Sequence, residues 1–252
     1  MKGTALRHHV MSSPNVEPRA EGKAVRILLL HYTDMATAQE ACAWLCNPAA
    51  KVSCHYLIDL NGDIIQMVDE ELRAWHAGQS AWKGERDINS VSIGIEIHNP
   101  GHDHGYPDFP PAQMKAVAAL GRDIAARHGI PPEHVLAHSD VAPQRKRDPG
   151  EKFDWQWLHE QGLGHWVMPH RLGGGQFLHE GDKGDAVEAL QAMLALYGYG
   201  VEITGSFDPA TKTVVTAFQR HFRPARIDGI ADRSTIETLR QLIDSLPGAA
   251  AT

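Results

Sequence analysis

The chain has 252 residues, 42% hydrophobic and 22% charged, which is enough for one or two complete cores. It carries 24 Lys and Arg against 31 Asp and Glu, and this net charge of −7 argues against a nucleic-acid partner, which needs a basic face. The longest apolar run, 25–30, contains Arg26 and is far shorter than the roughly 20 residues of a membrane span.

The first part of the chain alternates strand and helix patterns. Residues 1–24 carry Pro, Gly and charges without a signal-like apolar stretch, so an extended N-terminal arm is expected there. The expected elements that follow are a strand at 25–30, a helix at 36–46, a hairpin of 52–60 and 64–68 around Asn61-Gly62, a strand at 91–97, a helix at 111–128 and a strand at 135–137. They predict an α/β domain over 25–162, with a mixed central sheet flanked by helices.

The second part shows helical patterns only. Residues 163–177 include a Gly-rich stretch and are predicted to be a linker. Helices are expected at 185–196, 208–222 and 232–242, which predicts a small all-α three-helix domain over 178–246. Gly205, Asp208 and Thr211 recur 24 residues later as Gly229, Asp232 and Thr235. The domain is expected to fold separately and to contribute binding only.

The residue types suited to metal binding fall into two candidate groups. Cys42, Cys46 and Cys54 could be combined with His55 as a zinc site, but their spacing matches no common pattern, and buried apolar roles are favoured. The second group is also weak by spacing alone, because a chance trio is easy to assemble from 16 His and a structural role is favoured for any one of them. His31 directly follows the first strand, and the segment 137–150 has His138 near one end and Asp148 near the other.

Two histidines and an aspartate would give zinc three protein ligands and leave a position for water. In this interpretation His31, His138 and Asp148 hold the ion. Glu96, near the end of another strand, would accept the proton of the attacking water, and Lys146 would stabilise the developing oxyanion.

Five separated motifs then resemble one family. They are His31-Tyr32-Thr33, residues 53–58, Ala74-Trp75-His76-Ala77-Gly78, residues 92–96 and the segment 137–150. In this order they resemble the zinc-dependent N-acetylmuramoyl-L-alanine amidases related to phage T7 lysozyme and the peptidoglycan recognition proteins. Residues 178–245 are similar to the peptidoglycan-binding module that the AmiD type carries at its C-terminus.

The resemblance implies zinc as cofactor, with His31, His138 and Asp148 as ligands and Glu96 and Lys146 as catalytic residues. It implies hydrolysis of the amide between N-acetylmuramic acid and the L-alanine of the stem peptide, so the expected partner is peptidoglycan or a muropeptide. His55 and His76 lie in the motifs outside the ligand set. Lining the substrate groove is predicted for them, with a structural role as the alternative.

Two alternative functions stay open. The protein could be a non-catalytic peptidoglycan-binding protein with an inactive amidase-like domain. It could instead be an unrelated metallohydrolase that uses His98, His102 and His104, although a solvated loop is favoured for these residues.

Trp155 and Trp157 are expected to pack at the domain edge rather than stack on sugar. The binding module favours the periplasm or outer membrane, and the absence of a signal pattern would suit the cytoplasm.

Overall fold

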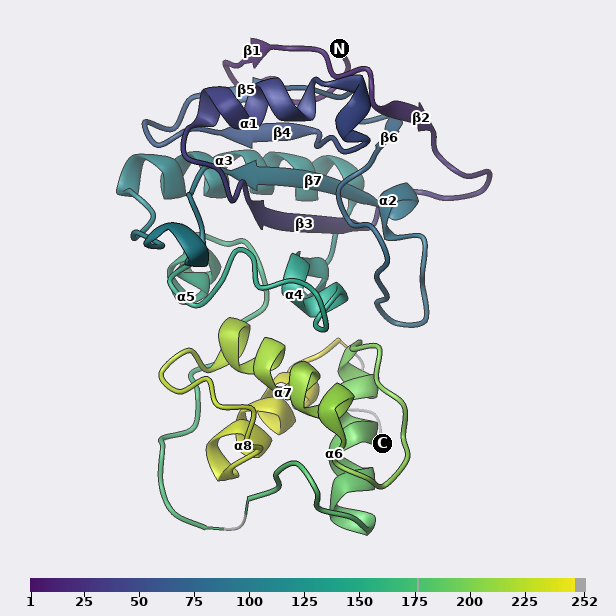
Figure 1. Ribbon diagram of the computed structural model, residues 1–252, viewed down its shortest axis with the longest axis vertical. Coiled ribbons are helices and arrows are strands. Elements are labelled where there is room, and N and C mark those ends of the chain that lie inside the picture. Colours follow the sequence, from purple (N-terminus) through teal and green to yellow (C-terminus); the bar gives the residue numbers. More distant parts are fainter. Residues whose placement is uncertain (176, 248–252) are drawn as a thin grey trace.

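A six-stranded mixed sheet forms the centre of the N-terminal domain in the computed structural model, which describes residues 1–175 and 177–247 (Figure 1). The strand order is β1-β5-β4-β7-β3-β8. The bounds are β1 (His9–Val10), β3 (Ile27–Tyr32), β4 (Tyr56–Ile58), β5 (Ile64–Gln66), β7 (Ser92–Ile97) and β8 (Val135–Ala137). β3 runs parallel to β7 and β8, whereas β4 and β5 form the antiparallel hairpin predicted around Asn61-Gly62. The predicted mixed α/β sheet is therefore confirmed.

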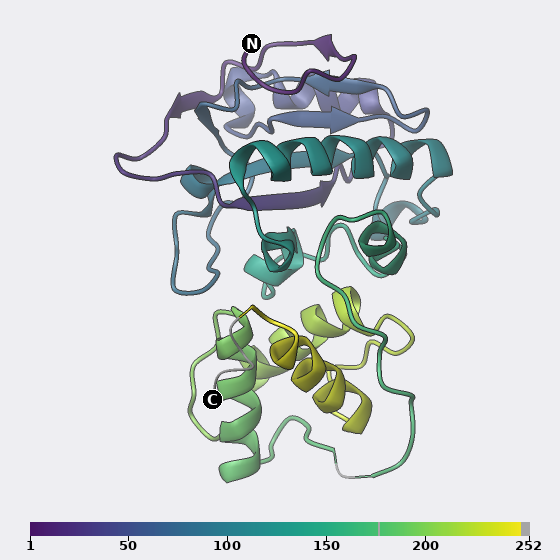
Figure 2. The ribbon, with the colours of Figure 1, turned by 180° about the vertical axis from the view of Figure 1, so that it is seen from behind.

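Two helices cover opposite faces of this sheet (Figures 1 and 2). Alternate residues along a strand point to opposite faces, so β4 sends Leu57 towards α1 (Ala38–Leu45) and its neighbours towards the main core. α3 (Pro111–His128) packs its apolar side on the other face. Cys42 and Cys54 are buried among apolar residues beside α1, as expected for small hydrophobic side chains.

The short elements are those that the sequence patterns did not reveal. They are β2 (Val16–Pro18), β6 (Leu72–Ala74), α2 (Ile88–Val91), α4 (His138–Val141), α5 (Trp155–Glu160) and the 3₁₀ turns η1 (Pro48–Ala50), η2 (His102–His104) and η3 (Pro132–His134). The predicted arm is extended, but it is also integrated into the domain. β1 pairs with β5 and β2 pairs with β6, so the arm adds a strand to each of two sheets.

The helical domain contains α6 (Asp185–Tyr197), α7 (Pro209–Phe222) and α8 (Arg233–Asp244), close to the three predicted helices. The 24-residue repeat has a structural cause. Asp208 and Asp232 each accept the backbone N–H of the threonine three residues later and so cap α7 and α8. Gln191 and Gln219 bind the backbone of the two Gly-containing turns that precede these caps.

The helical domain packs directly on the sheet domain, which differs from the expected separate module. α7 lies below α4 and α5 in Figure 1. Trp82 of the sheet domain is enclosed by Tyr197 and Tyr199, and the backbone N–H of Lys83 donates to Gly198 O at 2.8 Å. The two domains therefore share a continuous apolar core.

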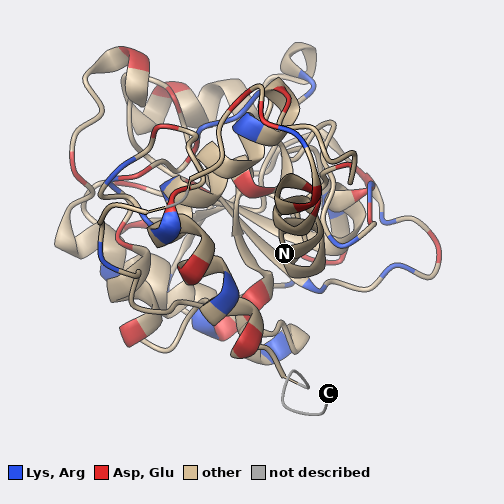
Figure 3. Ribbon diagram, turned by 90° about the horizontal axis from the view of Figure 1, so that it is seen from below, with Lys and Arg blue, Asp and Glu red and all other residues tan. Residues whose placement is uncertain are grey.

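The predicted linker 163–177 is packed over much of its length, although residue 176 lies outside the described residues. Leu163 and Trp166 are buried, and Trp166 contacts Phe222 of α7. Figure 3 shows basic and acidic positions interspersed in the view from the helical side. Among the described helices, none combines the length and the apolar composition needed to cross a membrane.

Candidate active site

Strand pairing brings the predicted ligands to one edge of the sheet. β3 and β7 pair in parallel with His31 opposite Glu96, so both side chains project from the same face. On its other side β3 pairs with β8, and Leu30 lies opposite Ala137. His138 is the next residue, at the start of α4. The carboxyl ends of three neighbouring strands therefore position three of the five predicted residues.

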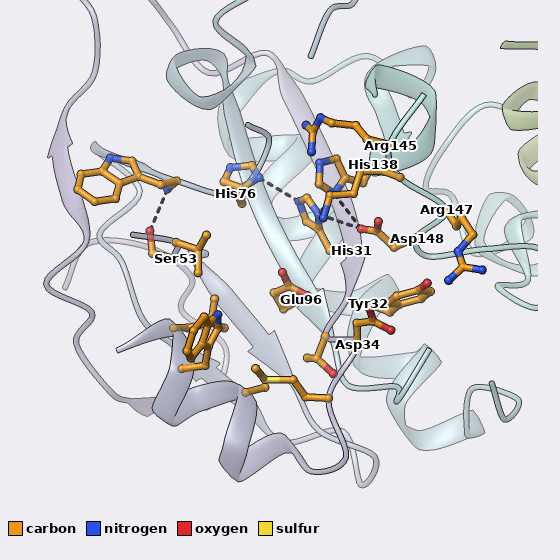
Figure 4. Close-up of a pocket in the computed structure, with 18 of the residues that line it drawn as sticks. His31, Tyr32, Asp34, Ser53, His76, Glu96, His138, Arg145, Arg147 and Asp148 are labelled. Atoms are coloured by element: carbon orange, nitrogen blue, oxygen red, sulfur yellow. Dashed lines mark hydrogen bonds and ion pairs between the residues drawn. The ribbon is translucent and has the colours of Figure 1, made fainter. Parts of the chain in front are cut away.

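The candidate metal ligands converge on one another (Figure 4). The Nδ1 atoms of His31 and His138 are 2.9 Å apart, and Asp148 Oδ2 lies 3.2 Å and 2.9 Å from them, respectively. All three residues are buried, and their ligand atoms lie within 4.8 Å of one another. Nitrogen and carboxylate donors at this separation suit a single ion such as zinc.

The other ring nitrogen of each histidine has its own partner. His31 Nε2 lies 3.0 Å from His76 Nδ1, and His138 Nε2 donates to Ala77 O at 3.1 Å. Protons on these Nε2 atoms leave both Nδ1 lone pairs available to a metal, which is the usual effect of such outer contacts. His76 in turn contacts Ser92 Oγ through its Nε2 at 3.3 Å. It lines the cavity and, through its contact, holds the ring of His31.

Burial and charge favour the ligand forms of these side chains. Burial lowers the pKa of His31 to about 4, so the ring is neutral near pH 7. Burial alone would raise the pKa of Asp148, but the charge of His138 and the hydrogen bonds of both histidines hold it well below its usual range. A neutral imidazole and an ionised carboxylate are the forms that bind metals.

Glu96 lies beside the ligands and has a free oxygen. Its Oε2 is shielded from solvent and has no hydrogen-bond partner among the described atoms. Burial, followed by the charge of Asp148, raises the pKa of Glu96 well above its ordinary value, and Lys146 opposes the shift. A buried polar atom without a partner points to a ligand or water in the adjoining space.

Glu96 and the three candidate ligands line a cavity of about 440 Å³. Lys146 contributes to its wall with Arg145 and Arg147, and Trp44 and Trp75 contribute aromatic surface. Sequence reasoning singled out Lys146 but missed the two arginines and both tryptophans as pocket residues. Trp44 had a usable signal, because it is a large aromatic residue on the exposed side of a helix that buries Cys42.

His55 does not reach this cavity, which corrects its predicted substrate contact. It is fully buried, its Nδ1 accepts the backbone N–H of Gly94, and its Nε2 contacts Arg19 and Leu72 O. Its ring supports the sheet. The alternative structural role that the sequence left open is the one that the geometry favours.

The other histidines and the cysteines also form no second metal site among residues 1–175 and 177–247. His98 contacts Thr33, whereas His102 contacts Tyr32 and Glu151. The alternative metal site of His98, His102 and His104 is therefore wrong. The possible zinc site of Cys42, Cys46, Cys54 and His55 is wrong as well. Trp155 is buried, which confirms its packing role.

His31, His138 and Asp148 would hold a metal ion and leave one coordination position free, next to the Glu96 carboxylate and Lys146. This combination of side chains is typical of a metal-dependent hydrolase. Comparison with known proteins narrows this class. The N-acetylmuramoyl-L-alanine amidase family matches residues 21–151, and a peptidoglycan binding domain family matches residues 183–239. The chain belongs to the N-acetylmuramoyl-L-alanine amidase family.

Individual relatives agree with this assignment. The amidase AmiD of Escherichia coli is 39% identical, over 96% of this chain and 91% of AmiD. The AmpD amidase of Salmonella typhimurium is 31% identical, over 61% of this chain and 89% of AmpD. The structure of E. coli AmiD with anhydro-N-acetylmuramic acid-L-Ala-D-gamma-Glu-L-Lys has a TM-score of 0.74 and 37% identity, and covers 90% of this chain and 93% of that one. The structure of AmpDh3 from Pseudomonas aeruginosa with an anhydromuramic pentapeptide has a TM-score of 0.73 and 31% sequence identity. The match covers 94% of this chain and 99% of AmpDh3.

Proposed function

We propose that this enzyme is a zinc-dependent amidase that hydrolyses the amide between N-acetylmuramic acid and L-alanine of the peptidoglycan stem peptide. The observation that carries the proposal is the convergence of His31, His138 and Asp148 beside Glu96 in the cavity. The relatives whose structures contain anhydromuramyl peptides support the substrate class. The complete ligand set favours catalysis over the alternative of a non-catalytic binding protein.

The three ligands fit zinc because they offer two nitrogens and one carboxylate oxygen, all buried. A zinc ion held there would polarise the scissile carbonyl and make water more acidic. Every other part of the reaction belongs to side chains of the chain itself. The His76 and Ala77 contacts keep the two imidazoles oriented while the substrate binds and leaves.

Glu96 is assigned the proton transfer. Glu96 lines the cavity, and its carboxylate would take a proton from the attacking water, then return it to the nitrogen of the departing L-alanine. Its raised pKa suits a carboxyl that must both accept and release a proton. Lys146, on the cavity wall, would stabilise the negative charge on the carbonyl oxygen in the transition state.

The cavity wall supports a muropeptide as substrate. Arg145 and Arg147 flank Lys146, and positive charge there suits the carboxylates of a stem peptide. Trp44 and Trp75 offer apolar faces of the kind on which a sugar ring packs. We further propose that the enzyme acts where polymeric peptidoglycan is held, in the periplasm or at the outer membrane, because residues 183–239 match a peptidoglycan binding domain.

Metal content and product release, measured together, test the proposal. Chelation should abolish hydrolysis of a soluble anhydromuropeptide, and zinc should restore it with about one ion per chain. His138→Ala should lose both the zinc and the activity, because one of three ligands is removed. His104→Ala is the matched control, since this exposed histidine lies outside the ligand set and should retain both. Full zinc occupancy and full rate in His138→Ala would refute the site.

A further inference from the structure

A buried carboxylate lies where the two domains meet. Asp140 of α4 is fully enclosed and accepts three hydrogen bonds. Its own domain supplies the backbone N–H of Ala137, 2.8 Å from Oδ2. The helical domain supplies the other two, from His221 Nδ1 to Oδ2 at 2.7 Å and from Tyr199 Oη to Oδ1 at 2.8 Å. A polar side chain away from water depends on such hydrogen-bond partners.

Asp140 fixes the turn that presents a candidate metal ligand. α4 spans only His138–Val141, and an isolated single turn of helix is unstable. The Asp140 carboxylate accepts the N–H of the residue just before His138 and so closes the start of this turn. Two residues further along, the backbone N–H of Ser139 donates to Asp148 O at 3.1 Å. Movement of α4 would therefore disturb two of the three candidate ligands.

The His221 ring is held firmly in the position from which it binds Asp140. It stacks on Trp155 of the sheet domain, with ring centroids 3.7 Å apart and planes 23° from parallel. Its other neighbour in the stack is Phe222, at 3.8 Å. A buried ring fixed on two sides is a preorganised donor. The contact across the domain boundary is thus a defined geometry rather than loose packing.

We propose that the helical domain is part of the support of the metal site, with His221 and Tyr199 holding Asp140 and Asp140 holding the turn that presents His138. This rests on the proposed function, because it takes His138 as a metal ligand. His221 and Tyr199 act as positioning residues through Asp140. We expect this support by the helical domain only in relatives that have such a domain. The Salmonella AmpD relative matches only 61% of this chain.

Two substitutions of His221, made in the full-length chain, separate its hydrogen bond to Asp140 from its packing between Trp155 and Phe222. His221→Phe keeps a flat ring between Trp155 and Phe222 but removes the donor to Asp140. His221→Asn shortens the side chain but keeps an N–H near the place of Nδ1. Loss of a contact that supports a metal ligand typically weakens metal binding about 10–100-fold, and we expect this for the Phe variant. The Asn variant should stay closer to the wild type.

The measurement is the dissociation constant of zinc, from competition with a chromophoric chelator, together with the visible spectrum of the cobalt-substituted protein. Leu239→Ala is the control, because it destabilises the helical domain from α8 without touching Asp140. It should keep the wild-type zinc affinity and cobalt spectrum in the folded protein. Tyr199→Phe removes only the hydrogen bond from Tyr199 Oη to Asp140 Oδ1 and should also weaken zinc binding. This variant takes the place of His221→Phe in the test if His221→Phe does not fold.

The outcomes distinguish this proposal from the function on which it rests. Unchanged zinc affinity in folded His221→Phe would overturn the positioning role while leaving the amidase assignment intact. An equal loss in His221→Phe and Leu239→Ala would also overturn it, since general destabilisation would then explain both. Failure of the wild-type chain to bind zinc would instead refute the proposed function, and the positioning role with it.

Discussion

Glu96 and Lys146 share the cavity wall with the metal ligands but make none of the contacts that hold those ligands together. Glu96→Gln should therefore retain zinc and lose activity by roughly 10²–10⁴-fold, the usual contribution of a general acid–base group. The amide keeps the shape of the carboxyl but cannot accept the proton. Lys146→Ala should likewise keep the metal and lower kcat, because its role is in the transition state.

Zinc content and kcat measured on the same samples decide the roles of both residues. Loss of zinc from either variant would move that residue from catalysis to the structure of the site. Retained zinc with an undiminished rate would exclude it from the reaction. His104→Ala serves again as the reference, because His104 is exposed and outside the group of three.

Individual residues were predictable where chemistry and strand position coincided. His31 directly follows the predicted first strand, and His138 and Asp148 bracket a short segment, but only the resemblance of five motifs singled out this group among 16 histidines. The contact by which His76 orients His31, and the complete burial of His55, could not be predicted from the sequence. Both histidines lie in motifs, and only the packing of the sheet decides which ring faces the cavity and which ring meets Gly94 and Arg19.

At the scale of single elements, β7 makes room for the His76 ring through Gly94. A Cβ added to Gly94 would lie 2.6 Å from His76 Nδ1 and 2.7 Å from its Cγ, closer than van der Waals contact allows. Gly94→Ala should push the ring away and break its contact with His31 Nε2. We expect zinc affinity to fall by about tenfold or more, as for other losses of support to a metal ligand.

Chelator competition also tests this prediction, with Gly173→Ala as the control. Gly173 has open space around the position of an added Cβ, so the control should bind zinc like the wild type. A Gly94→Ala protein that folds and keeps wild-type affinity would show that His76 does not orient His31. In that case the pocket-lining role predicted for His76 would be the one that remains.

Elements were predictable where an apolar run or a repeated period marked them. The long helix at 111–128 was expected with the bounds that the structure shows, because many turns repeat the same apolar period. β1 and β2 contain two and three residues and lack the apolar run that revealed the equally short β8. They exist because β5 and β6 offer partners, and that information lies in the tertiary structure.

For the whole molecule, the sequence carries a signal for a second domain but none for its contacts with the first. Composition changes at the Gly-rich stretch and marks the second domain. Nothing in the patterns shows that Trp82 would be enclosed by Tyr197 and Tyr199, or that Asp140 would find His221. Contacts between residues far apart in the chain depend on the complete fold, so the expected independent module and the observed shared core differ.

Glu70 connects distant parts of the sheet domain. Its carboxylate is buried, accepts the Tyr56 hydroxyl at 2.5 Å and Arg127 at 2.6 and 2.8 Å, and lies 2.6 Å from His128 Nε2. Burial alone would raise its pKa, but the hydrogen bonds of Arg127, His128 and Tyr56 lower it to about 2. Glu70 thus ties the sheet to the C-terminal end of α3.

The pKa of Glu70 is lower in the folded chain than in the unfolded chain, where a glutamate titrates near pH 4.5. Its stabilisation is therefore present above about pH 4.5 and is lost as the pH falls towards 2. Glu70→Gln should reduce the free energy of unfolding by about 2–3 kcal/mol at pH 7, because it removes one partner of a buried ion pair. Urea unfolding at several pH values should show this difference shrinking below pH 4.5. Glu71→Gln is the control, since Glu71 pairs with Lys2 at the exposed surface and should change stability little. A constant difference between wild type and Glu70→Gln from pH 7 to pH 3 would contradict the argument.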